Sequence, residues 1–437
     1  MNLLLVPGTT LIASEYLEAL RPIKNLHLFG AGFDTEHPLC IKYQCFESLS
    51  ANLNEAIPVA IRKIVSTHSI DLVIPCHDDW IFALSNVKEE LEAFCLTPMP
   101  EIAKIIRSKR LTYRKLFNSI PVPKTFPNLE SIEDFPVFIK PDRGQGSKDS
   151  KIINSLSELN FFTGLSGAIE EPWLVSEYLN GQEFTVDCFS DTQGQLLYCS
   201  TRLRIETRNG LAVRTQVLPH VDDSSWAKSI LNLLPMVGSW FFQYKLDSNH
   251  NRKLLEVAAR PAGASGINRL FGVNLPLLNV LQATGIACEI QNYKEAVSTN
   301  KLVNSEITEA VFHSRIFKKI FVDFDDTLVS WQDPLTPNTQ ILNFLNVCRL
   351  EGKELTLISR HKGDLMARLK QLNIALLFNR IIHIKDFSSK GSLMEKTHED
   401  SLFIDDSFAE RKDVKNQIGD SIVTVDPSAF SFQWSRF

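Results

Sequence analysis

Two carboxylates stand two positions apart at the end of a short apolar run near residue 320. The run 320–322 precedes Asp323, and Asp325 and Thr327 follow it closely. An apolar strand there would deliver both carboxylates to its carboxyl end, where the next turn exposes them. Such a pair beside a hydroxyl group can hold Mg²⁺ and present one oxygen as a nucleophile towards phosphorus. The alternative is a strand that ends in a solvated acidic turn without chemistry.

Three later features suit the same chemistry. A second apolar run ends in Ser359, whose hydroxyl can bond a phosphate oxygen. Lys390 can neutralise charge on a transferring phosphoryl group, although two other lysines lie nearby in the sequence. A third apolar run ends in the pair Asp405 and Asp406, which would complete a metal shell. Together with the first pair, these groups predict a phosphate site.

In this order the four features resemble the haloacid dehalogenase-like (HAD) phosphatase superfamily, over residues 316–437. The resemblance implies that Asp323 is a nucleophile forming an aspartyl-phosphate and that Asp325 is the general acid and base. It also implies that Ser359 and Lys390 hold the phosphoryl group. The implied Mg²⁺ ligands are Asp323, the backbone carbonyl of Asp325, and Asp405 or Asp406. The short spacings between these motifs leave little room for a cap, so we expect an open site, used for large substrates or covered by another domain.

The first two-thirds of the chain carries groups suited to a nucleotide. Lys140 ends an apolar run and precedes a loop with Gly144 and Gly146, and a lysine beside amide-rich backbone can hold phosphate. A later run ends in Glu256, an acid suited to Mg²⁺, with Arg260 shortly after it for phosphate. Each fragment taken alone is also compatible with an ordinary surface loop.

The order of these fragments resembles the ATP-grasp superfamily from residue 1 to about residue 290. The segments that carry the resemblance are Ser108-Lys109 with Ile120-Pro121-Val122-Pro123, residues 135–141 with their glycine loop, residues 177–183, and residues 256–260. The resemblance implies bound ATP and Mg²⁺. The implied ATP-binding residues are Lys109, Lys140, Gly144, Gly146, Glu177, Leu179 and Glu183. It assigns Glu256 and Gln243 to Mg²⁺, and Arg260 to the transferring phosphate.

One departure from the family pattern is Ala258, which stands where the family places a metal-binding asparagine. A different metal arrangement or reduced activity would follow. The family's acceptor pocket lies between the first domain and the late strands. Candidate contacts for a carboxylate substrate are Arg204, Arg214 and Arg269, because arginine pairs well with carboxylates. A plain surface salt bridge is the alternative for each, and His77 is a candidate for the rim of the pocket.

The elements that must position these residues alternate between short apolar runs and helical patterns. Apolar runs at 3–6, 26–29 and 72–75 predict strands of a parallel sheet. The patterns at 80–94, 101–119 and 226–241 predict helices. The expected fold class is α/β multidomain. We expect a pre-ATP-grasp Rossmann-like domain at 1–100, an ATP-grasp domain of α+β type at 101–296, a linker at 297–315, and a HAD-like Rossmannoid three-layer α/β/α domain without a large cap at 316–437.

Composition narrows the function further. The chain has 46 lysines and arginines against 51 acidic residues, a net charge of −5, which gives no sign of a nucleic-acid or membrane partner. The 8 cysteines form no metal-binding pair motif and suit a reducing compartment. The apolar start of the chain lacks a basic leader and suits a buried strand. We therefore expect a cytoplasmic protein.

The leading hypothesis is a bifunctional enzyme. An ATP-grasp module would join a small-molecule carboxylate to an amine through an acyl phosphate, and a HAD module would hydrolyse a phosphomonoester of the same pathway. Two alternatives stay open: a ligase with a non-catalytic HAD docking or regulatory module, and a phosphatase with a nucleotide-sensing ATP-grasp module. A homodimer is compatible with the resemblance, since ATP-grasp proteins often dimerise.

Overall fold

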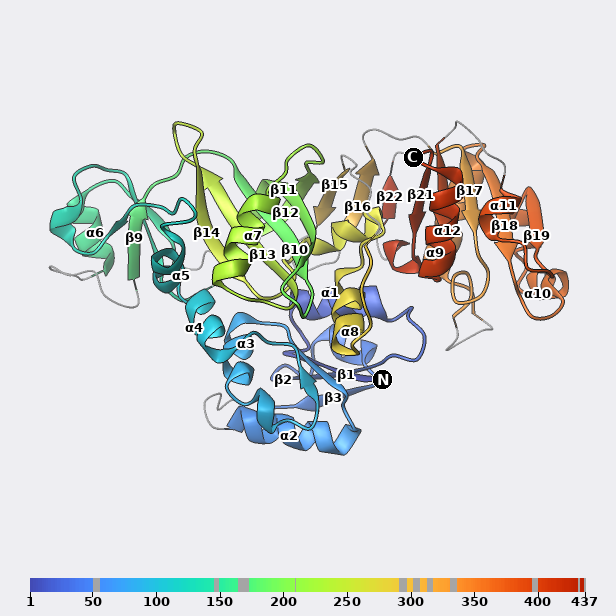
Figure 1. The fold of residues 1–437 in the computed structure, drawn as a ribbon, viewed down its shortest axis with the longest axis horizontal. Helices are drawn as coiled ribbons and strands as arrows, with labels where there is room; N and C mark the ends of the chain where they lie inside the picture. The colour runs from blue at the N-terminus through green and yellow to red at the C-terminus, as the bar shows by residue number, and fades with distance from the viewer. Residues whose placement is uncertain are drawn as a thin grey trace.

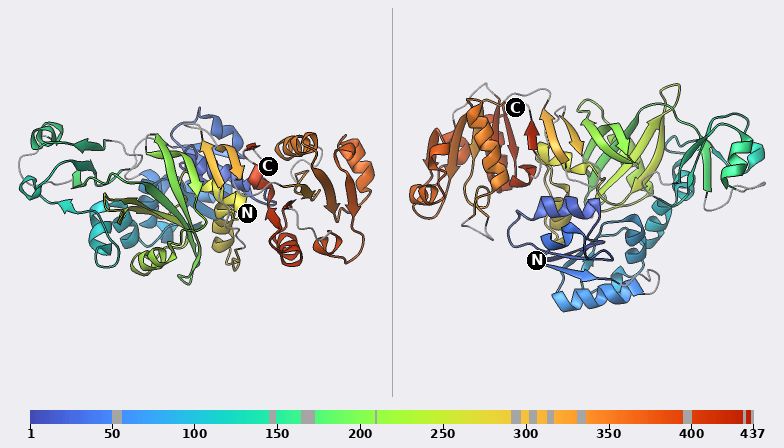
Figure 2. Two further views of the ribbon diagram at one scale, coloured as in Figure 1. Left: turned by 90° about the horizontal axis from the view of Figure 1, so that it is seen from above. Right: turned by 180° about the vertical axis from the view of Figure 1, so that it is seen from behind.

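The computed structural model describes residues 1–49, 56–144, 149–163, 173–208, 210–290, 297–301, 307–312, 317–330, 336–394, 400–430 and 433–435. Four sheets organise these residues. In Figure 1 the amino-terminal sheet lies below a large central sheet, with a small sheet at one end and a carboxyl-terminal module at the other. The view from above in Figure 2 places helix α6 (Leu156–Thr163) and the carboxyl-terminal module at opposite ends of the molecule.

The amino-terminal module is a parallel five-stranded sheet with strand order β3-β2-β1-β4-β5. Its strands are β1 Asn2–Val6, β2 His27–Gly32, β3 Cys45–Ser48, β4 Leu72–Pro75 and β5 Phe94–Cys95, and its helices are α1 Leu11–Leu20, α2 Ala56–His68 and α3 Asp78–Ser85. Alternate residues of β1 enter two cores, Leu3 and Leu5 on the side of α1, and Leu4 and Val6 on the side of α2 and α3. This arrangement confirms the predicted parallel sheet with covered faces.

The predicted helix at 80–94 is wrong over its second half, because α3 ends at Ser85 and β5 follows. The predicted helix at 101–119 is two helices, α4 Pro100–Arg107 and α5 Lys109–Leu116. The break lies at Ser108, whose backbone is extended and whose side chain accepts a hydrogen bond from the backbone of Leu111. A serine cap of this kind starts a new helix, and here it places Lys109 at the first position of α5.

A small antiparallel sheet and a large central sheet follow. The small sheet, order β6-β9-β7-β8, contains β6 Thr125–Phe126, β7 Val137–Pro141, β8 Lys151–Ile153 and β9 Trp173–Glu177, next to α6 Leu156–Thr163. The central sheet has eight strands in the order β14-β13-β10-β11-β12-β15-β16-β22. These are β10 Glu183–Ser190, β11 Leu196–Arg208, β12 Leu211–Val217, β13 Gly238–Leu246, β14 Arg252–Ala258, β15 Val297–Lys301, β16 Ile307–Phe312 and β22 Gln433–Ser435.

Three helical segments accompany the central sheet, α7 Ser224–Leu233, the 3₁₀ segment η4 Ser265–Phe271 and α8 Leu275–Ala283. The predicted helix at 226–241 is wrong at its end, because Gly238 already begins β13. The segment expected as a linker, 297–315, contains β15 and β16, which extend the central sheet. The last strand, β22, pairs with β16, so the end of the chain returns to this sheet.

The carboxyl-terminal module is a parallel five-stranded sheet with strand order β19-β18-β17-β20-β21. Its strands are β17 Lys319–Val322, β18 Glu354–Ser359, β19 Arg380–His383, β20 Ser401–Ile404 and β21 Ile422–Val425. Its helices are α9 Thr339–Leu350, α10 Leu365–Gln371, α11 Lys390–Leu393 and α12 Phe408–Ile418, and the 3₁₀ segment η6 spans Pro427–Phe430. Ile320 packs with Phe344 of α9, and Phe321 packs with Val414 of α12. Helices therefore cover both faces of the sheet.

None of the described helices combines the length and the apolar character that a membrane span requires.

Candidate functional site

Two lysines face the loop that follows β7. Lys140 is buried near the end of β7, and its Nζ donates a hydrogen bond to the hydroxyl of Tyr113 at 2.9 Å. Lys109 donates through Nζ to three carbonyl oxygens of the loop at 3.2–3.4 Å. The carboxylate of Asp142 ties the loop to α5, because it accepts a hydrogen bond from the hydroxyl of Ser108 at 2.6 Å. The loop is thereby held beside both ammonium groups.

Burial lowers the pKa of Lys140 to about 8, against the opposing attraction of Glu256, Glu183 and Asp142. Burial also lowers the pKa of Lys109. An ammonium group that has lost hydration interacts strongly with an anion that enters the same space, because the local dielectric is low. The pair is therefore suited to phosphate.

The connection between β9 and β10 holds the residues expected to contact a nucleoside. Glu177 is occupied within the protein, since its Oε1 accepts a hydrogen bond from the backbone N–H of Lys124 at 2.7 Å. Leu179 is buried and lines a cavity. Glu183 forms an ion pair with Nε of Arg204 at 2.8 Å. The hydrogen bond to Glu177 therefore holds the connection between β9 and β10 in place. Glu177, Leu179 and Glu183 all line the same cavity.

Gln243 on β13 and Glu256 on β14 are directly opposite each other in the sheet. With its amide oriented to satisfy its neighbours, Gln243 donates to Oε1 of Glu256 at 3.2 Å and accepts from Nη1 of Arg204 at 2.8 Å. A carboxylate and an amide side by side supply oxygen ligands of the kind that Mg²⁺ binds. The structure therefore brings the two predicted metal ligands together.

A cavity of about 870 Å³ lies between the small sheet and the central sheet, and part of it is open to solvent. The predicted nucleotide and metal residues that line it are Lys109, Lys140, Gly144, Glu177, Leu179, Glu183, Gln243 and Glu256. Gly146 lies outside the described residues. Residues from four separate stretches of the sequence thus converge on one space whose size suits a small-molecule ligand.

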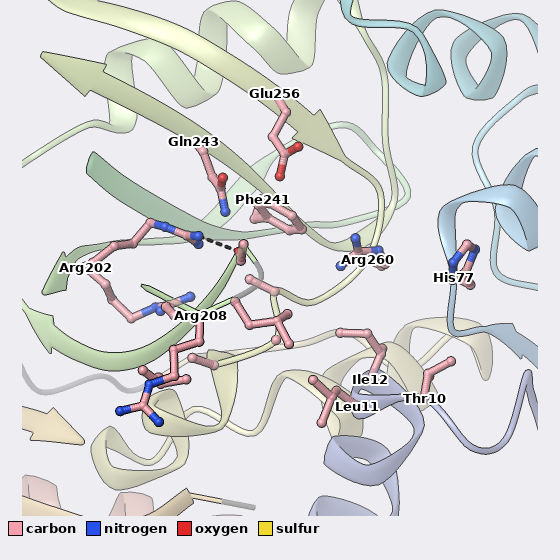
Figure 3. Close-up of a pocket in the computed structure, with 18 of the residues that line it drawn as sticks. Thr10, Leu11, Ile12, His77, Arg202, Arg208, Phe241, Gln243, Glu256 and Arg260 are labelled. Atoms are coloured by element: carbon pink, nitrogen blue, oxygen red, sulfur yellow. Dashed lines mark hydrogen bonds between the residues drawn. The ribbon is translucent and has the colours of Figure 1, made fainter. Parts of the chain in front are cut away.

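A second cavity, of about 1000 Å³, adjoins the first and shares Arg204, Gln243 and Glu256 with it. Figure 3 shows its position between the central sheet and the amino-terminal module, with His77 on the far side from Arg202. Because the shared residues lie at the junction, a group bound in one cavity can reach a group bound in the other.

The arginines that line the second cavity differ in how deeply they are buried. Arg202 is fully buried, and its guanidinium contacts both oxygens of Asp187 at 2.6 and 3.0 Å, so its charge is balanced. Arg208, at the end of β11, is largely exposed. Neither residue was predicted from the sequence as a cavity contact. The spacing of two between Arg202 and Arg204 was the available signal, because alternate strand residues share a face.

Arg260 also lines the second cavity, and it bonds both oxygens of Asp78 at 2.6 and 2.9 Å. Asp78 begins α3, directly after His77. Burial by itself would raise the pKa of Asp78, but the guanidinium of Arg260 holds that pKa below its usual value. This pair joins the amino-terminal module to the segment after β14. His77 was expected at the rim of the pocket, but the pairing of Asp78 with Arg260 was not predicted from the sequence.

Two of the three predicted substrate arginines lie elsewhere. Arg214 is exposed on β12 and does not line either cavity. Arg269 is buried in η4, where it forms an ion pair with Glu15 of α1 and donates to the carbonyl of Ser428 in η6 at 3.0 Å. Its charge is used to join three segments. Of the three, only Arg204 lines the cavities.

Ala258 lies two residues after Glu256 on β14 and is paired with Phe241 of β13. The three side chains of Ala258, Phe241 and Ala262 form a small apolar cluster. The position where a second amide ligand would be expected is therefore apolar, and Glu256 and Gln243 are the metal ligands that this part of the sheet offers among the described residues.

In the carboxyl-terminal module, the predicted phosphate residues gather at the carboxyl ends of β17, β18 and β20. Nζ of Lys390 lies 2.8 Å from Oδ1 of Asp323 and 2.6 Å from Oδ2 of Asp405. Asp406 is fixed by Thr327, whose hydroxyl accepts from the backbone N–H of Asp406 at 3.1 Å. The lysine between two buried acids is the one that the sequence pattern favoured over its neighbours.

Asp323, Asp405 and Asp406 offer oxygens within 4.8 Å of one another. Burial raises the pKa of each of the three carboxyl groups to about 6. A divalent cation among them would replace the lost hydration and offset their mutual repulsion. This donor set fits Mg²⁺, which prefers carboxylate oxygens and keeps several waters.

Asp325 projects from the same turn and is half exposed. Its two oxygens lie 2.9 and 3.0 Å from Nδ1 of His361, in the loop after β18. The hydroxyl of Ser359 is buried and accepts from the backbone N–H of His361 at 3.2 Å. Asp326, next in the chain, forms an ion pair with Lys24 of the amino-terminal module at 3.4 Å. Neither His361 nor Lys24 was predicted from the sequence.

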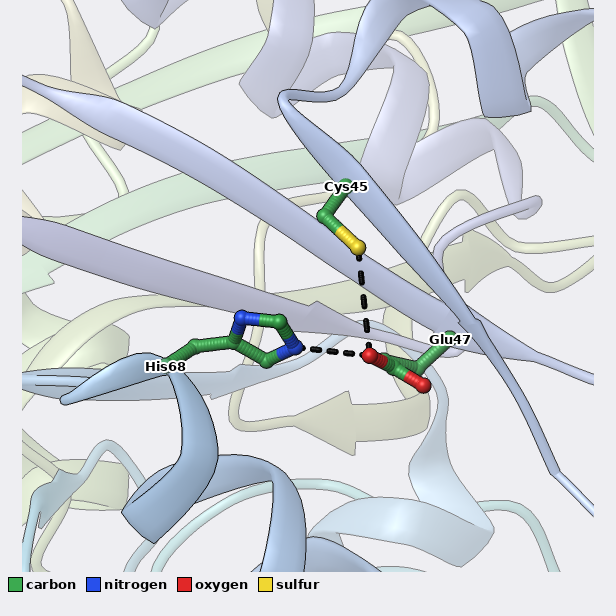
Figure 4. Close-up of side chains that lie close together, drawn as sticks. All are labelled: Cys45, Glu47 and His68. Carbon is green, nitrogen blue, oxygen red and sulfur yellow. Dashed lines mark hydrogen bonds and ion pairs between the residues drawn. The ribbon is translucent and has the colours of Figure 1, made fainter.

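A third group of donors lies apart from both sites, at the edge strand β3 (Figure 4). Nε2 of His68, at the end of α2, lies 2.6 Å from Oε1 of Glu47, and Sγ of Cys45 lies 3.8 Å from the same oxygen. Cys45 and Glu47 share a face of β3 because they are two residues apart. The contact between His68 and Glu47 ties the helix to the edge strand and accounts for the grouping.

A family model described as "ATP-grasp in the biosynthetic pathway with Ter operon" matches residues 170–308. The match spans the central strands that carry Arg204, Gln243 and Glu256. Over these residues the chain is similar to this ATP-grasp family. The match ends before β17, so it does not include the carboxyl-terminal module. It does include β15, within the segment expected as a linker.

The chain is also similar to a carbamoyl-phosphate synthase of Methanobrevibacter smithii, with 30% identity over 142 residues, which are 29% of this chain and 37% of the relative. The chain therefore matches little more than a third of the length of that curated relative.

Solved structures extend the likeness at the level of the fold. The biotin carboxylase domain of the Hydrogenobacter thermophilus 2-oxoglutarate carboxylase, solved with MgADP, ADP and bicarbonate, matches with a TM-score of 0.56 at 11% identity, over 68% of this chain and 74% of that one. N5-carboxyaminoimidazole synthetase from Staphylococcus aureus, solved with ADP, matches with a TM-score of 0.54 at 13% identity, over 69% and 82%.

Proposed function

We propose that the ATP-grasp fold of this chain is an ATP-dependent carboxylate–amine ligase. The observation that carries the proposal is the pair of adjoining cavities that share Arg204, Gln243 and Glu256. One cavity holds two buried lysines beside a loop, and the other is lined by arginines. This arrangement suits a nucleotide in the first cavity and a carboxylate in the second, with the transferred phosphate at their junction.

In this proposal Lys109 and Lys140 bind the phosphates of ATP, and Glu256 with Gln243 binds Mg²⁺. A carboxylate oxygen would attack the γ-phosphorus of ATP while the bond to the β-phosphate oxygen breaks, which would give an acyl phosphate and ADP. Arg204 lies at the junction, where a guanidinium stabilises the charge that develops on the transferred group. The amine then attacks the acyl carbon, and phosphate leaves. Binding of ADP by solved structures of the same fold supports the nucleotide assignment.

The test is a screen of small carboxylates and amines for release of ADP by the full chain. We expect release that requires both an acid and an amine, and loss of about 10²-fold or more in kcat for Glu256→Gln, because a metal ligand in the reacting site is removed. Glu101→Gln, an exposed change on α4, serves as the control. ADP release that is independent of any acid and amine would contradict the ligase and favour a nucleotide-sensing module.

We also propose that the carboxyl-terminal module is a Mg²⁺-dependent phosphatase of the HAD type, acting on a phosphomonoester of the same pathway. The supporting observation is the contact of Lys390 with both Asp323 and Asp405 at one edge of the sheet. An oxygen of Asp323 would attack phosphorus while the bond to the leaving oxygen breaks, and Asp325 would protonate that oxygen. Asp325 would next take a proton from the water that hydrolyses the aspartyl-phosphate.

This second proposal is tested with p-nitrophenyl phosphate and the full chain. We expect Mg²⁺-dependent hydrolysis that falls by at least about 10³-fold in Asp323→Asn, because the nucleophile is lost. Asp420→Asn, a change at a fully exposed residue, is the matched control. Hydrolysis that persists in Asp323→Asn would disprove the nucleophile assignment. No hydrolysis of any phosphomonoester would leave the module as a docking or regulatory unit.

A further inference from the structure

An open groove of about 680 Å³ lies beside the proposed phosphatase site. It is formed by the loop after β18 and the loop after β19, which are neighbouring strands. His361 lines this groove and also contacts Asp325 through Nδ1 at 2.9 Å. The groove therefore begins at the group proposed to protonate the leaving oxygen, and the non-phosphate part of a substrate would extend into it.

Hydrogen bonds between the two loops fix the shape of the groove. Nε2–H of His383 donates to the carbonyl of His361 at 2.9 Å. Arg360 donates to the carbonyl of Ser388 at 2.8 Å, and its Nε pairs with Glu410 at 2.9 Å. Because Glu410 balances the charge of Arg360, this arginine has a structural role in holding the loops together.

Two lysines in the groove have no such role. Lys362 and Lys385 are exposed and line the groove from opposite loops. Neither has an ion-pair partner within the described part of the chain. The one carboxylate that lines the groove, Asp386, accepts a hydrogen bond from the backbone N–H of Ser388 at 2.9 Å. The groove therefore carries more unbalanced positive than negative charge.

We propose that this groove binds a second anionic group, a carboxylate or a phosphate, of the phosphomonoester substrate. The proposal rests on the proposed phosphatase function and narrows its substrate class. The phosphoryl group binds at Asp323 and Lys390, the leaving oxygen faces Asp325, and the second anion lies between Lys362 and Lys385. A carboxylate there agrees with a ligase that uses a carboxylate on the same chain.

The test compares two substrates that differ in one group. 3-Phosphoglycerate carries a carboxylate where glycerol 1-phosphate carries a hydroxymethyl group. We expect the wild-type chain to hydrolyse 3-phosphoglycerate with a kcat/KM about tenfold higher, mainly through KM, since two exposed charge contacts contribute modestly. The double variant Lys362→Ala/Lys385→Ala should lose this preference and keep its rate with glycerol 1-phosphate. Lys370→Ala, an exposed lysine on α10, should keep the preference.

Binding of the same two compounds to Asp323→Asn protein, read by calorimetry, tests the groove without turnover. Tighter binding of 3-phosphoglycerate that depends on Lys362 and Lys385 supports the groove proposal, whether or not hydrolysis occurs. If binding has this dependence and hydrolysis is absent, only the phosphatase proposal fails. Two outcomes would contradict the groove proposal without contradicting the phosphatase proposal. In the first, hydrolysis requires Asp323 but shows no preference between the two compounds. In the second, the double variant retains the preference. Equal binding of both compounds to Asp323→Asn overturns the groove proposal as well.

Discussion

At the scale of single residues, the proposed nucleotide cavity is lined by two lysines whose hydration is reduced by burial. Lys140 contacts the hydroxyl of Tyr113 and lies 5.4 Å from the centre of its ring. Its pKa falls from 10.5 to about 8 because burial penalises the charged form. Between these two pH values the unfolded chain binds more protons than the folded chain, so the stability of the protein should rise with pH there.

This shift predicts proton uptake when a nucleotide binds. Phosphate beside Lys140 raises the pKa of the ammonium group, so at about pH 8.5 binding of ADP should take up protons from the buffer. Calorimetry in buffers with different ionisation enthalpies measures the uptake. Lys140→Met should lose the share of the proton uptake that is due to Lys140. Lys140→Arg should lose the same share, because arginine is protonated both with and without bound nucleotide. Uptake that is the same in all three proteins would show that Lys140 does not meet the phosphate.

At the scale of elements, three short segments join the modules. The guanidinium of Arg269 in η4 contacts Glu15 of α1 and the carbonyl of Ser428 in η6. Nδ2 of Asn274 donates to the carbonyl of Ala19 and to the hydroxyl of Ser428, both at 3.1 Å. These buried contacts connect the first, central and last parts of the chain in one place. Figure 1 shows α1 below the base of the central sheet.

The ion pair in this joint predicts the effect of removing one partner. Arg269→Met should lower the free energy of unfolding by about 3–5 kcal/mol, because it leaves Glu15 buried without its cation. The double variant Glu15→Met/Arg269→Met should be less destabilised than Arg269→Met. Denaturant unfolding measures both. Arg269→Met should also keep the ligase KM for the carboxylate when folded, and a large rise in that KM would restore the substrate role expected from sequence.

At the scale of the whole molecule, the modules share a hydrophobic core. Leu270 and Phe271 of η4 pack in the same cluster as Phe344 of α9 and Phe430 of η6. The last strand, β22, pairs with β16 of the central sheet. The carboxyl-terminal module is therefore packed against the central sheet and is not a free appendage.

A shared core predicts cooperative unfolding of the two modules. Phosphatase activity and nucleotide binding should be lost at the same denaturant concentration, and MgADP at about 100 times its Kd should stabilise both by about 2.7 kcal/mol. Phe430→Ala should shift both losses together, by roughly 3–5 kcal/mol. Two transitions, with MgADP moving one of them, would show that the modules unfold independently.

Much of the fold and of both sites followed from local pattern. The apolar runs before Asp323, Ser359 and Asp405 each form a strand in the predicted place, because a short run of buried residues between turns has few other ways to fold. The expected nucleotide-binding residues that the structure describes line one space. The errors lay where local pattern is ambiguous, as at β13, which reads as the end of a helix until its pairing with β10 is known.

Long-range partners could not be predicted in this way. The sequence made Arg204 and Arg269 equally good candidates for substrate contacts. In the structure Arg204 lines both cavities, whereas Arg269 is buried against Glu15. The segment at 297–315 lacks a strong strand pattern, and it forms strands because edges of existing sheets offer hydrogen bonds.

The sequence by itself determined which chemical groups this protein presents and in what order, because residue type and spacing along a strand fix which side chains reach its carboxyl end. Asp323, Asp325 and Lys140 are of this kind. Only the tertiary structure decided which charges are already paired, which cavities adjoin and which modules share a core. Those properties depend on contacts between residues far apart in the chain, and burial sets their strength.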